Sequence, residues 1–105
     1  PVVGAAWADG LEQRPDGLWP QWDADVLADA LSDVAEREFA EEWEAISAPT
    51  LLIRGERGSI PGDQISRMLR ARPETRLETI ANAGHDVHLE QPVAWLKALR
   101  EFLDP

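Results

Sequence analysis

The sequence has no cysteine, and this absence excludes a disulfide framework and thiol chemistry. A chain without cysteine fits the cytoplasm, which is the location we expect. No apolar run reaches about 18 residues, so the sequence predicts no membrane-spanning helix. The first residues, Pro1–Trp7, lack both the basic start of a signal peptide and an initiator methionine. We therefore expect that the chain was processed or cleaved.

Basic residues are also scarce, because 10 lysines and arginines oppose 20 aspartates and glutamates in a chain of net charge −10. Residues 1–48 hold 12 acidic and two basic residues, whereas residues 49–105 hold eight of each. An acidic surface repels phosphate backbones, so we expect no nucleic-acid partner. We interpret the acidic half as a solvated helix face, with a protein-binding surface as the alternative.

The first half predicts irregular structure followed by one long helix. Residues 1–22 show no sustained helical period, and Asp16-Gly17 between two short runs predicts a turn or a short hairpin. Asp23 or Asp25 can cap the helix that follows. Its apolar residues recur at helical spacing until Pro49 ends it, since the residue before a proline resists the helical region.

The second half predicts the order strand, helix, strand, helix. Thr50–Ile53 is an apolar run typical of a strand buried on both faces of a parallel sheet. A short helix around Ile65 ends before Pro73, Thr75–Ile80 forms the second strand, and Val93–Leu103 forms the last helix. Two parallel strands are not stable alone, so we expect neighbours outside this chain. The side chains expected to face the core are Leu77, Ile80, Leu96, Leu99, Phe102 and Leu103.

Two motifs in this half carry the chemistry. The first is Pro49-Thr50-Leu51-Leu52-Ile53-Arg54-Gly55, and the second, after the next strand, is Gly84-His85-Asp86-Val87-His88-Leu89-Glu90-Gln91-Pro92. A base that works near neutral pH is most readily a histidine, and the glycine before His85 lets the backbone turn there. The alternative for His85 is a loop residue that caps the next helix. We expect His88 to pack or hydrogen-bond within the loop, and Glu90 to brace the loop or the start of the last helix, where a carboxylate is favoured.

In this order and separation, the two motifs resemble the end of an α/β-hydrolase, over residues 40–103. The resemblance implies an α/β fold: the C-terminal part of an α/β-hydrolase parallel sheet with a preceding helical cap segment. Residues 1–38 would be the end of the cap segment and residues 39–105 the C-terminal part of the core. The resemblance also implies that His85 is the catalytic base, which takes a proton from a serine hydroxyl and returns it to the leaving group.

No serine of the chain lies in the Gly-x-Ser-x-Gly frame in which this family holds its nucleophile. The resemblance therefore places the nucleophile in an N-terminal portion of the same hydrolase, which is the partner we expect. The family's usual acid positions, three or four residues after Gly55, hold Gly58 and Ser59, which cannot orient an imidazolium by charge. Glu56 is our first candidate for the acid. Asp63, more typical of a helix cap, is the second, and an acid outside the chain is the alternative.

The implied function is hydrolysis of an ester, thioester or lactone, with His85 as base and then acid and without a cofactor. If an aspartate replaces the serine nucleophile, His85 activates water instead, as in epoxide hydrolases and dehalogenases. A non-catalytic acidic protein-binding domain on the same fold is the other alternative.

Three tryptophans of the first half, Trp7, Trp19 and Trp22, could line a pocket for a small apolar substrate. Ordinary packing within an irregular cap is the alternative interpretation. The histidine loop has no helical His-Glu-x-x-His pattern, so we expect no metal site there.

Overall fold

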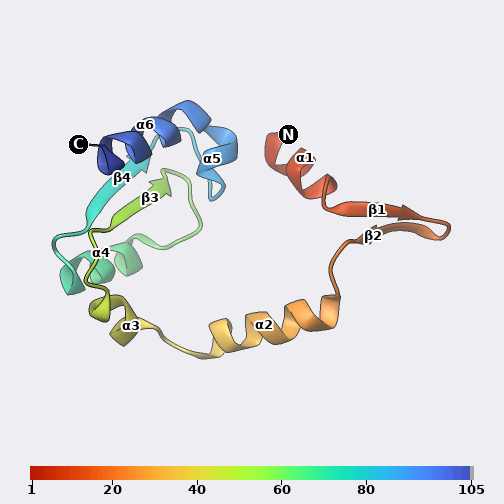
Figure 1. Ribbon diagram of the computed structural model, residues 1–105, viewed down its shortest axis with the longest axis horizontal. Helices are drawn as coiled ribbons and strands as arrows, with labels where there is room; N and C mark the ends of the chain where they lie inside the picture. Colours follow the sequence, from red (N-terminus) through yellow and green to blue (C-terminus); the bar gives the residue numbers. More distant parts are fainter. Residues whose placement is uncertain (105) are drawn as a thin grey trace. The chain divides into compact units, whose positions relative to one another are not determined.

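A computed structural model describes residues 1–104, and the chain divides into two compact units, Pro1–Phe39 and Ala40–Pro105 (Figure 1). The predicted division after residue 38 lies beside this boundary. The assignment of the first unit to a cap segment stays a prediction. None of the helices among residues 1–104 is both long and apolar enough to cross a membrane.

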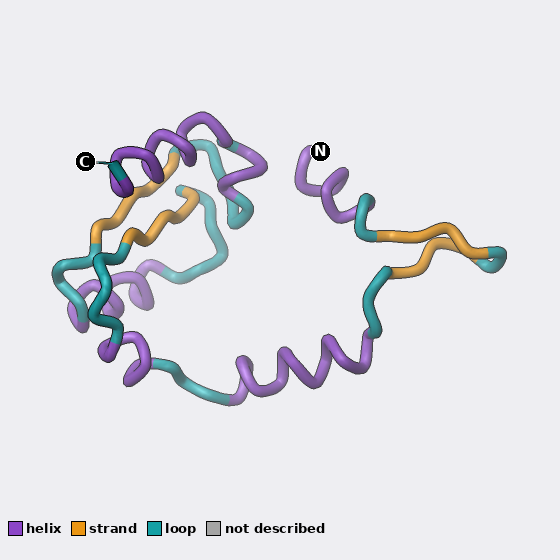
Figure 2. The backbone as a smooth tube through the Cα atoms, in the orientation of Figure 1, coloured by secondary structure: helices purple, strands orange, loops and turns teal. Residues whose placement is uncertain are grey.

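The first unit contains two helices and a hairpin (Figure 2). Its elements are α1 (Val2–Ala8), β1 (Leu11–Arg14), β2 (Gly17–Pro20) and α2 (Ala24–Glu36). The strands pair antiparallel, which confirms the hairpin, and Gly17 has a φ of 140°, a value that glycine adopts without a steric penalty. Helix α1 was not predicted, because its seven residues make only about two turns and bury none of their side chains.

Asp23 caps α2, as one of the two predicted alternatives. Its Oδ1 accepts hydrogen bonds from the backbone amides of Asp25 and Val26, at 2.9 and 3.2 Å. An aspartate here satisfies amides of the first turn that have no helical partner. None of the α2 side chains is buried, so the helix gains little from packing within the described chain.

The predicted long helix is wrong, because the chain forms two helices in its place. Helix α2 ends at Glu36, Arg37 is extended with φ −122° and ψ 138°, and α3 (Ala40–Ala45) begins the second unit. The last turn of α2 has no basic residue to interact with the helix dipole. After the break, Glu41 and Glu42 fall in the first turn of α3, where a carboxylate is favoured.

The second unit is built on a parallel pair of strands. After α3 it contains β3 (Leu51–Gly55), α4 (Gly62–Ala71), β4 (Arg76–Ile80), α5 (Val87–Glu90) and α6 (Pro92–Leu103). Strands β3 and β4 pair in parallel, α4 connects them, and α6 contacts both strands (Figure 1). The predicted strand–helix–strand–helix order is confirmed, and the short α5 lies inside what was expected to be a loop.

The core of this unit lies where β4 enters the following loop. Ile80, Ala83 and Val87 are buried there, and three half-buried side chains pack against them, namely Ile53, Ala94 and Trp95. The expectation that β3 is buried on both faces is wrong for residues 1–104. Leu51–Arg54 are only half-buried, because β4 is the one strand that pairs with β3 in this part of the chain.

Three side chains predicted to face the core are exposed. The exposed fraction is 36% for Leu77, 40% for Leu96 and 69% for Leu103. In their place α6 buries Ala98, whose small side chain permits a close approach to the strands. Ile80 is buried and both Leu99 and Phe102 are half-buried, so the spacing predicted α6 and part of its packed side correctly.

A buried arginine fixes the start of β3. Arg72 is 3% exposed and donates hydrogen bonds to Thr50 Oγ1 at 2.8 Å, to the Ala48 carbonyl at 3.1 Å and to Glu74 Oε1 at 2.9 Å. Its guanidinium carbon lies 5.3 Å from the ring centroid of Trp43. The end of α4 is thereby joined to the segment that enters β3.

Candidate active site

His85 lies in the loop that follows β4, and its side chain is exposed. Ile80, the last residue of β4, pairs with Gly55, the last residue of β3. Both strands therefore end at the same edge of the sheet. The carboxyl edge of parallel strands is where α/β folds assemble their ligand sites.

Gly55 brings this loop into direct contact with the end of β3. A Cβ atom at position 55 would overlap the carbonyl oxygens of Ala83 and Gly84 and would lie 2.7 Å from the Ala83 carbonyl carbon. No side chain fits in that space. Glycine is therefore required here for the loop that carries His85 to approach so closely.

The loop that carries His85, residues 81–86, is the histidine loop. Hydrogen bonds from the segment after β3 hold it in place. The amides of Glu56 and Arg57 donate to the carbonyls of Ile80 and Ala83, both at 2.9 Å. Arg57 Nη2 donates to the Asn82 carbonyl at 3.1 Å, and the Asn82 amide donates to Glu56 Oε2 at 3.1 Å. Asn82 has a φ of 56°, a left-handed conformation that asparagine adopts more readily than most residues.

Glu90 braces the same loop from its other end. Its Oε2 accepts a hydrogen bond from the Gly84 amide, and a carboxylate is a strong acceptor for a backbone amide. Gln91 Nε2 also donates to the Asn82 carbonyl, at 3.3 Å. The bracing role predicted for Glu90 is confirmed, and the backbone on the N-terminal side of His85 is fixed by several contacts.

The Ser59 side chain lies within hydrogen-bonding distance of the His85 ring. Its Oγ lies 3.3 Å from His85 Nδ1, across 26 residues of sequence. Ser59 is one of the two positions that the sequence analysis considered for the acid, and it was set aside because a hydroxyl carries no charge. Its place four residues after Gly55 is the signal that could have identified it.

The two carboxylates predicted for the acid have other partners. Glu56 binds the Asn82 amide, and Asp63 pairs with Arg67 at 3.2 Å on an exposed face of α4. Asp63 lies in the first turn of α4 and its side chain does not cap the helix. Among residues 1–104 neither carboxylate hydrogen-bonds to His85, so their catalytic role stays a prediction.

His88 packs, as expected. Its ring centroid lies 6.1 Å from that of Trp95, with the planes tilted by 57°. In the described part of the chain, no group of three or more histidine, aspartate or glutamate residues is placed to hold a metal ion.

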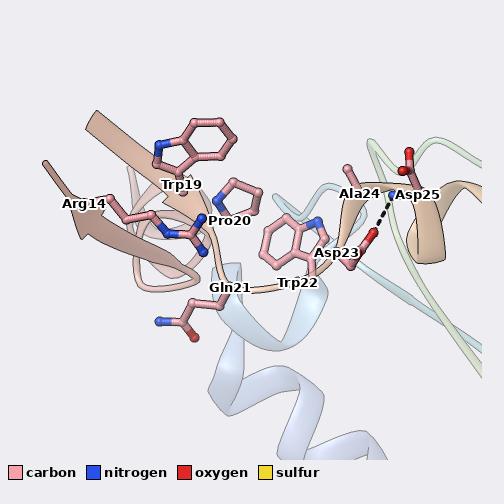
Figure 3. A pocket seen from close by; sticks show the side chains of 8 residues that line it. All are labelled: Arg14, Trp19, Pro20, Gln21, Trp22, Asp23, Ala24 and Asp25. Carbon is pink, nitrogen blue, oxygen red and sulfur yellow. Dashed lines mark hydrogen bonds between the residues drawn. The ribbon is translucent and has the colours of Figure 1, made fainter. Parts of the chain in front are cut away.

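Trp19 and Trp22 line an open groove of about 450 Å³ in the first unit (Figure 3). Trp19 Nε1 donates to Asp16 Oδ1 at 2.9 Å, and the Arg14 guanidinium carbon lies 5.5 Å from the Trp19 ring centroid. Trp7 packs edge-on against Trp22, with ring centroids 6.4 Å apart. Trp22 thus both packs and lines the groove, and binding of a substrate there stays a prediction.

Comparison with known sequences identifies relatives, although no protein-family model matches the chain. It is 34% identical over 95 residues to esterase YbfF of Escherichia coli K12, which covers 90% of this chain and 36% of that protein. It is 31% identical over 80 residues to the Mus musculus protein named sn-1-specific diacylglycerol lipase ABHD11, covering 75% of this chain and 25% of that protein. The chain therefore spans well under half the length of either relative.

Solved structures agree on the fold. E-2-(acetamidomethylene)succinate hydrolase matches 91% of this chain and 36% of its own, with a TM-score of 0.84 at 23% identity. Carboxylesterase CesB of Bacillus subtilis matches 62% of this chain and 24% of its own, with a TM-score of 0.54 at 31% identity. These matches confirm the predicted fold class. Together with the sequence relatives, they show that the chain belongs to the α/β-hydrolases and corresponds to part of such a protein.

Proposed function

We propose that this chain supplies the catalytic histidine of a serine-type α/β-hydrolase that cleaves an ester, thioester or lactone. The names of its relatives, an esterase and a lipase, favour this class of reaction. The observation that carries the proposal is the place of His85. Its exposed side chain projects from a loop whose backbone, just before His85, is hydrogen-bonded to the segment after β3 and to Glu90.

In the proposed reaction, His85 takes the proton of a serine hydroxyl as the serine oxygen attacks the acyl carbon. The proton then passes to the oxygen or sulfur of the leaving group, and water completes the cycle by the same steps. A general base must be accessible to the nucleophile and restricted in orientation. The contact at Gly55 and the hydrogen bonds of Arg57 and Glu90 restrict the backbone that carries the accessible ring.

The nucleophile belongs, in this proposal, to an N-terminal portion of the same hydrolase, and the two portions together form the assembled enzyme. The incomplete burial and pairing of β3 support this proposal. Leu51, Leu52 and Ile53 are only half-buried, and β4 is the one strand that pairs with β3 among residues 1–104. A further parallel strand would pair the remaining backbone groups of β3 and cover its apolar side chains. The groove beside Trp19 is our candidate for binding an apolar part of the substrate.

Hydrolysis of p-nitrophenyl butyrate by the assembled enzyme tests the proposal. We expect His85→Ala to lower kcat/KM by about 10²- to 10⁴-fold, the usual contribution of a general base. His88→Ala is the matched control, because His88 is also an exposed histidine, three residues away in α5, but packs on Trp95. If His85→Ala were as active as His88→Ala, the catalytic role of His85 would be refuted.

A fluorophosphonate probe distinguishes the alternatives. We expect it to label one serine outside this chain, with a rate that falls in His85→Ala. An aspartate nucleophile would leave the enzyme unlabelled but active on epoxides or haloalkanes. A protein-binding domain would show neither labelling nor turnover.

A further inference from the structure

We propose that Ser59 is a positioning residue for His85, with its hydroxyl as the partner of the ring at Nδ1. The proposal rests on the function proposed above. The observation that supports it is the 3.3 Å distance between Ser59 Oγ and His85 Nδ1. Two carboxylates of the adjoining segments bind elsewhere, since Glu56 accepts from the Asn82 amide and Glu90 accepts from the Gly84 amide.

The backbone sets the place of the hydroxyl. After β3 the chain turns back on itself, because the Gly58 amide donates to the Gly55 carbonyl at 3.0 Å. A Cβ at position 58 would lie 3.0 Å from that carbonyl oxygen, so the turn leaves little room for a side chain. Ser59 follows the turn directly, and α4 begins at Gly62. The serine is therefore held in a short link between a tight turn and a helix.

A hydroxyl can donate to Nδ1 or accept from it, and the proposed role is that of the acceptor. When Nδ1 carries the proton, it donates to Ser59 Oγ, and Nε2 then presents the lone pair that accepts a proton. A hydroxyl can accept this hydrogen bond but adds no charge to stabilise the protonated ring. In this arrangement Ser59 orients the histidine and supports the tautomer that can act as a base. The effect on rate is that of one neutral hydrogen bond, about fivefold.

Nitrogen NMR of ¹⁵N-histidine-labelled assembled enzyme tests the contact without reference to turnover. We expect Ser59→Ala to change the ring nitrogen shifts of His85 and to lower the population protonated at Nδ1. Ser59→Thr keeps the hydroxyl and should keep the shifts. Ser66→Ala is the matched control, because the Ser66 hydroxyl bonds to the Gly62 carbonyl on α4 at 3.0 Å. Unchanged His85 shifts in Ser59→Ala would overturn the proposal.

Kinetics test the consequence for catalysis. We expect Ser59→Ala to lower kcat about fivefold with little change in KM. In Ser59→Asp the acid limb of the kcat/KM profile should move to higher pH, because a carboxylate beside the ring favours its protonated form. Glu56, Arg57 and Glu90 are present in every variant, so a difference between the pH profiles reports the effect of the side chain at position 59.

The outcomes separate this proposal from the function on which it rests. If His85→Ala retains full turnover, the proposed function is wrong, whatever the NMR result. If His85→Ala is inactive but Ser59→Ala and Ser59→Asp match the wild type in shifts and pH profile, the role of Ser59 is overturned. Covalent labelling of Ser59 by a fluorophosphonate would also overturn it, because Ser59 would then be a nucleophile.

Discussion

Replacement of Gly55 by alanine is the perturbation whose effect the structure specifies most closely. The new methyl group would overlap two carbonyl oxygens of the histidine loop, those of Ala83 and Gly84. Both belong to backbone and cannot rotate away. The loop must therefore move from the end of β3, and His85 must move with it.

The substitution lowers the free energy of unfolding in two ways. Placing an extra methyl group in a tightly packed site costs about 1–3 kcal/mol. Moving the loop also weakens the hydrogen bond between the Arg57 amide and the Ala83 carbonyl, worth about 1 kcal/mol. We therefore expect Gly55→Ala to lower the free energy of unfolding by about 2–4 kcal/mol. A displacement of His85 by about 1 Å could also lower kcat/KM by about 10²-fold.

Urea unfolding of the assembled enzyme, followed by circular dichroism, measures the first effect. Gly62→Ala is the matched control, because a Cβ at this first residue of α4 meets no atom within 4 Å. Alanine there should be neutral or stabilising by up to about 1 kcal/mol. Equal unfolding midpoints for Gly55→Ala and Gly62→Ala would refute the close contact between strand end and loop.

Two further substitutions test the supports of the site and of β3. Glu90→Ala removes the acceptor of the Gly84 amide, and we expect a loss of about 2 kcal/mol in urea unfolding together with lower esterase activity. Arg72→Met keeps the apolar stem but removes the hydrogen bonds to Thr50 and Ala48, and we expect a loss of about 2–3 kcal/mol, measured in the same way.

Exposed charges of the second unit provide the controls for these substitutions. Lys97→Ala and Arg67→Ala each remove one member of an exposed ion pair spaced four residues apart on a helix. Such pairs contribute about 0.5 kcal/mol or less. If Glu90→Ala or Arg72→Met were no more destabilising than these controls, the supporting role of that residue would be wrong.

The sequence correctly predicted elements whose signals lie in a few neighbouring residues. The apolar run in β3 and the cap at Asp23 are both visible in a few neighbouring residues, and the structure confirms both. The break at Arg37 was missed, because helical spacing continues across it and the spacing of apolar residues does not show where hydrogen bonding stops. Leu77 was expected in the core, but its burial depends on what covers that face of β4.

The candidate active site likewise combines a residue that a local motif shows with a contact that only the fold creates. His85 was identified from a motif in one loop, whereas Ser59 meets it across 26 residues. The sequence shows a carboxylate at position 56 and a hydroxyl at position 59, but not which of them faces the ring. That choice depends on the turn at Gly58 and on the approach of the loop to Gly55, which are tertiary contacts.

Chemical rescue tests most directly the central claim that His85 is the base. The measurement is kcat/KM of His85→Ala in the assembled enzyme as imidazole is added, with His88→Ala and the wild type in parallel. We predict that imidazole restores activity to His85→Ala in a saturable manner and leaves the other two proteins unchanged. Full activity of His85→Ala without imidazole would contradict the account.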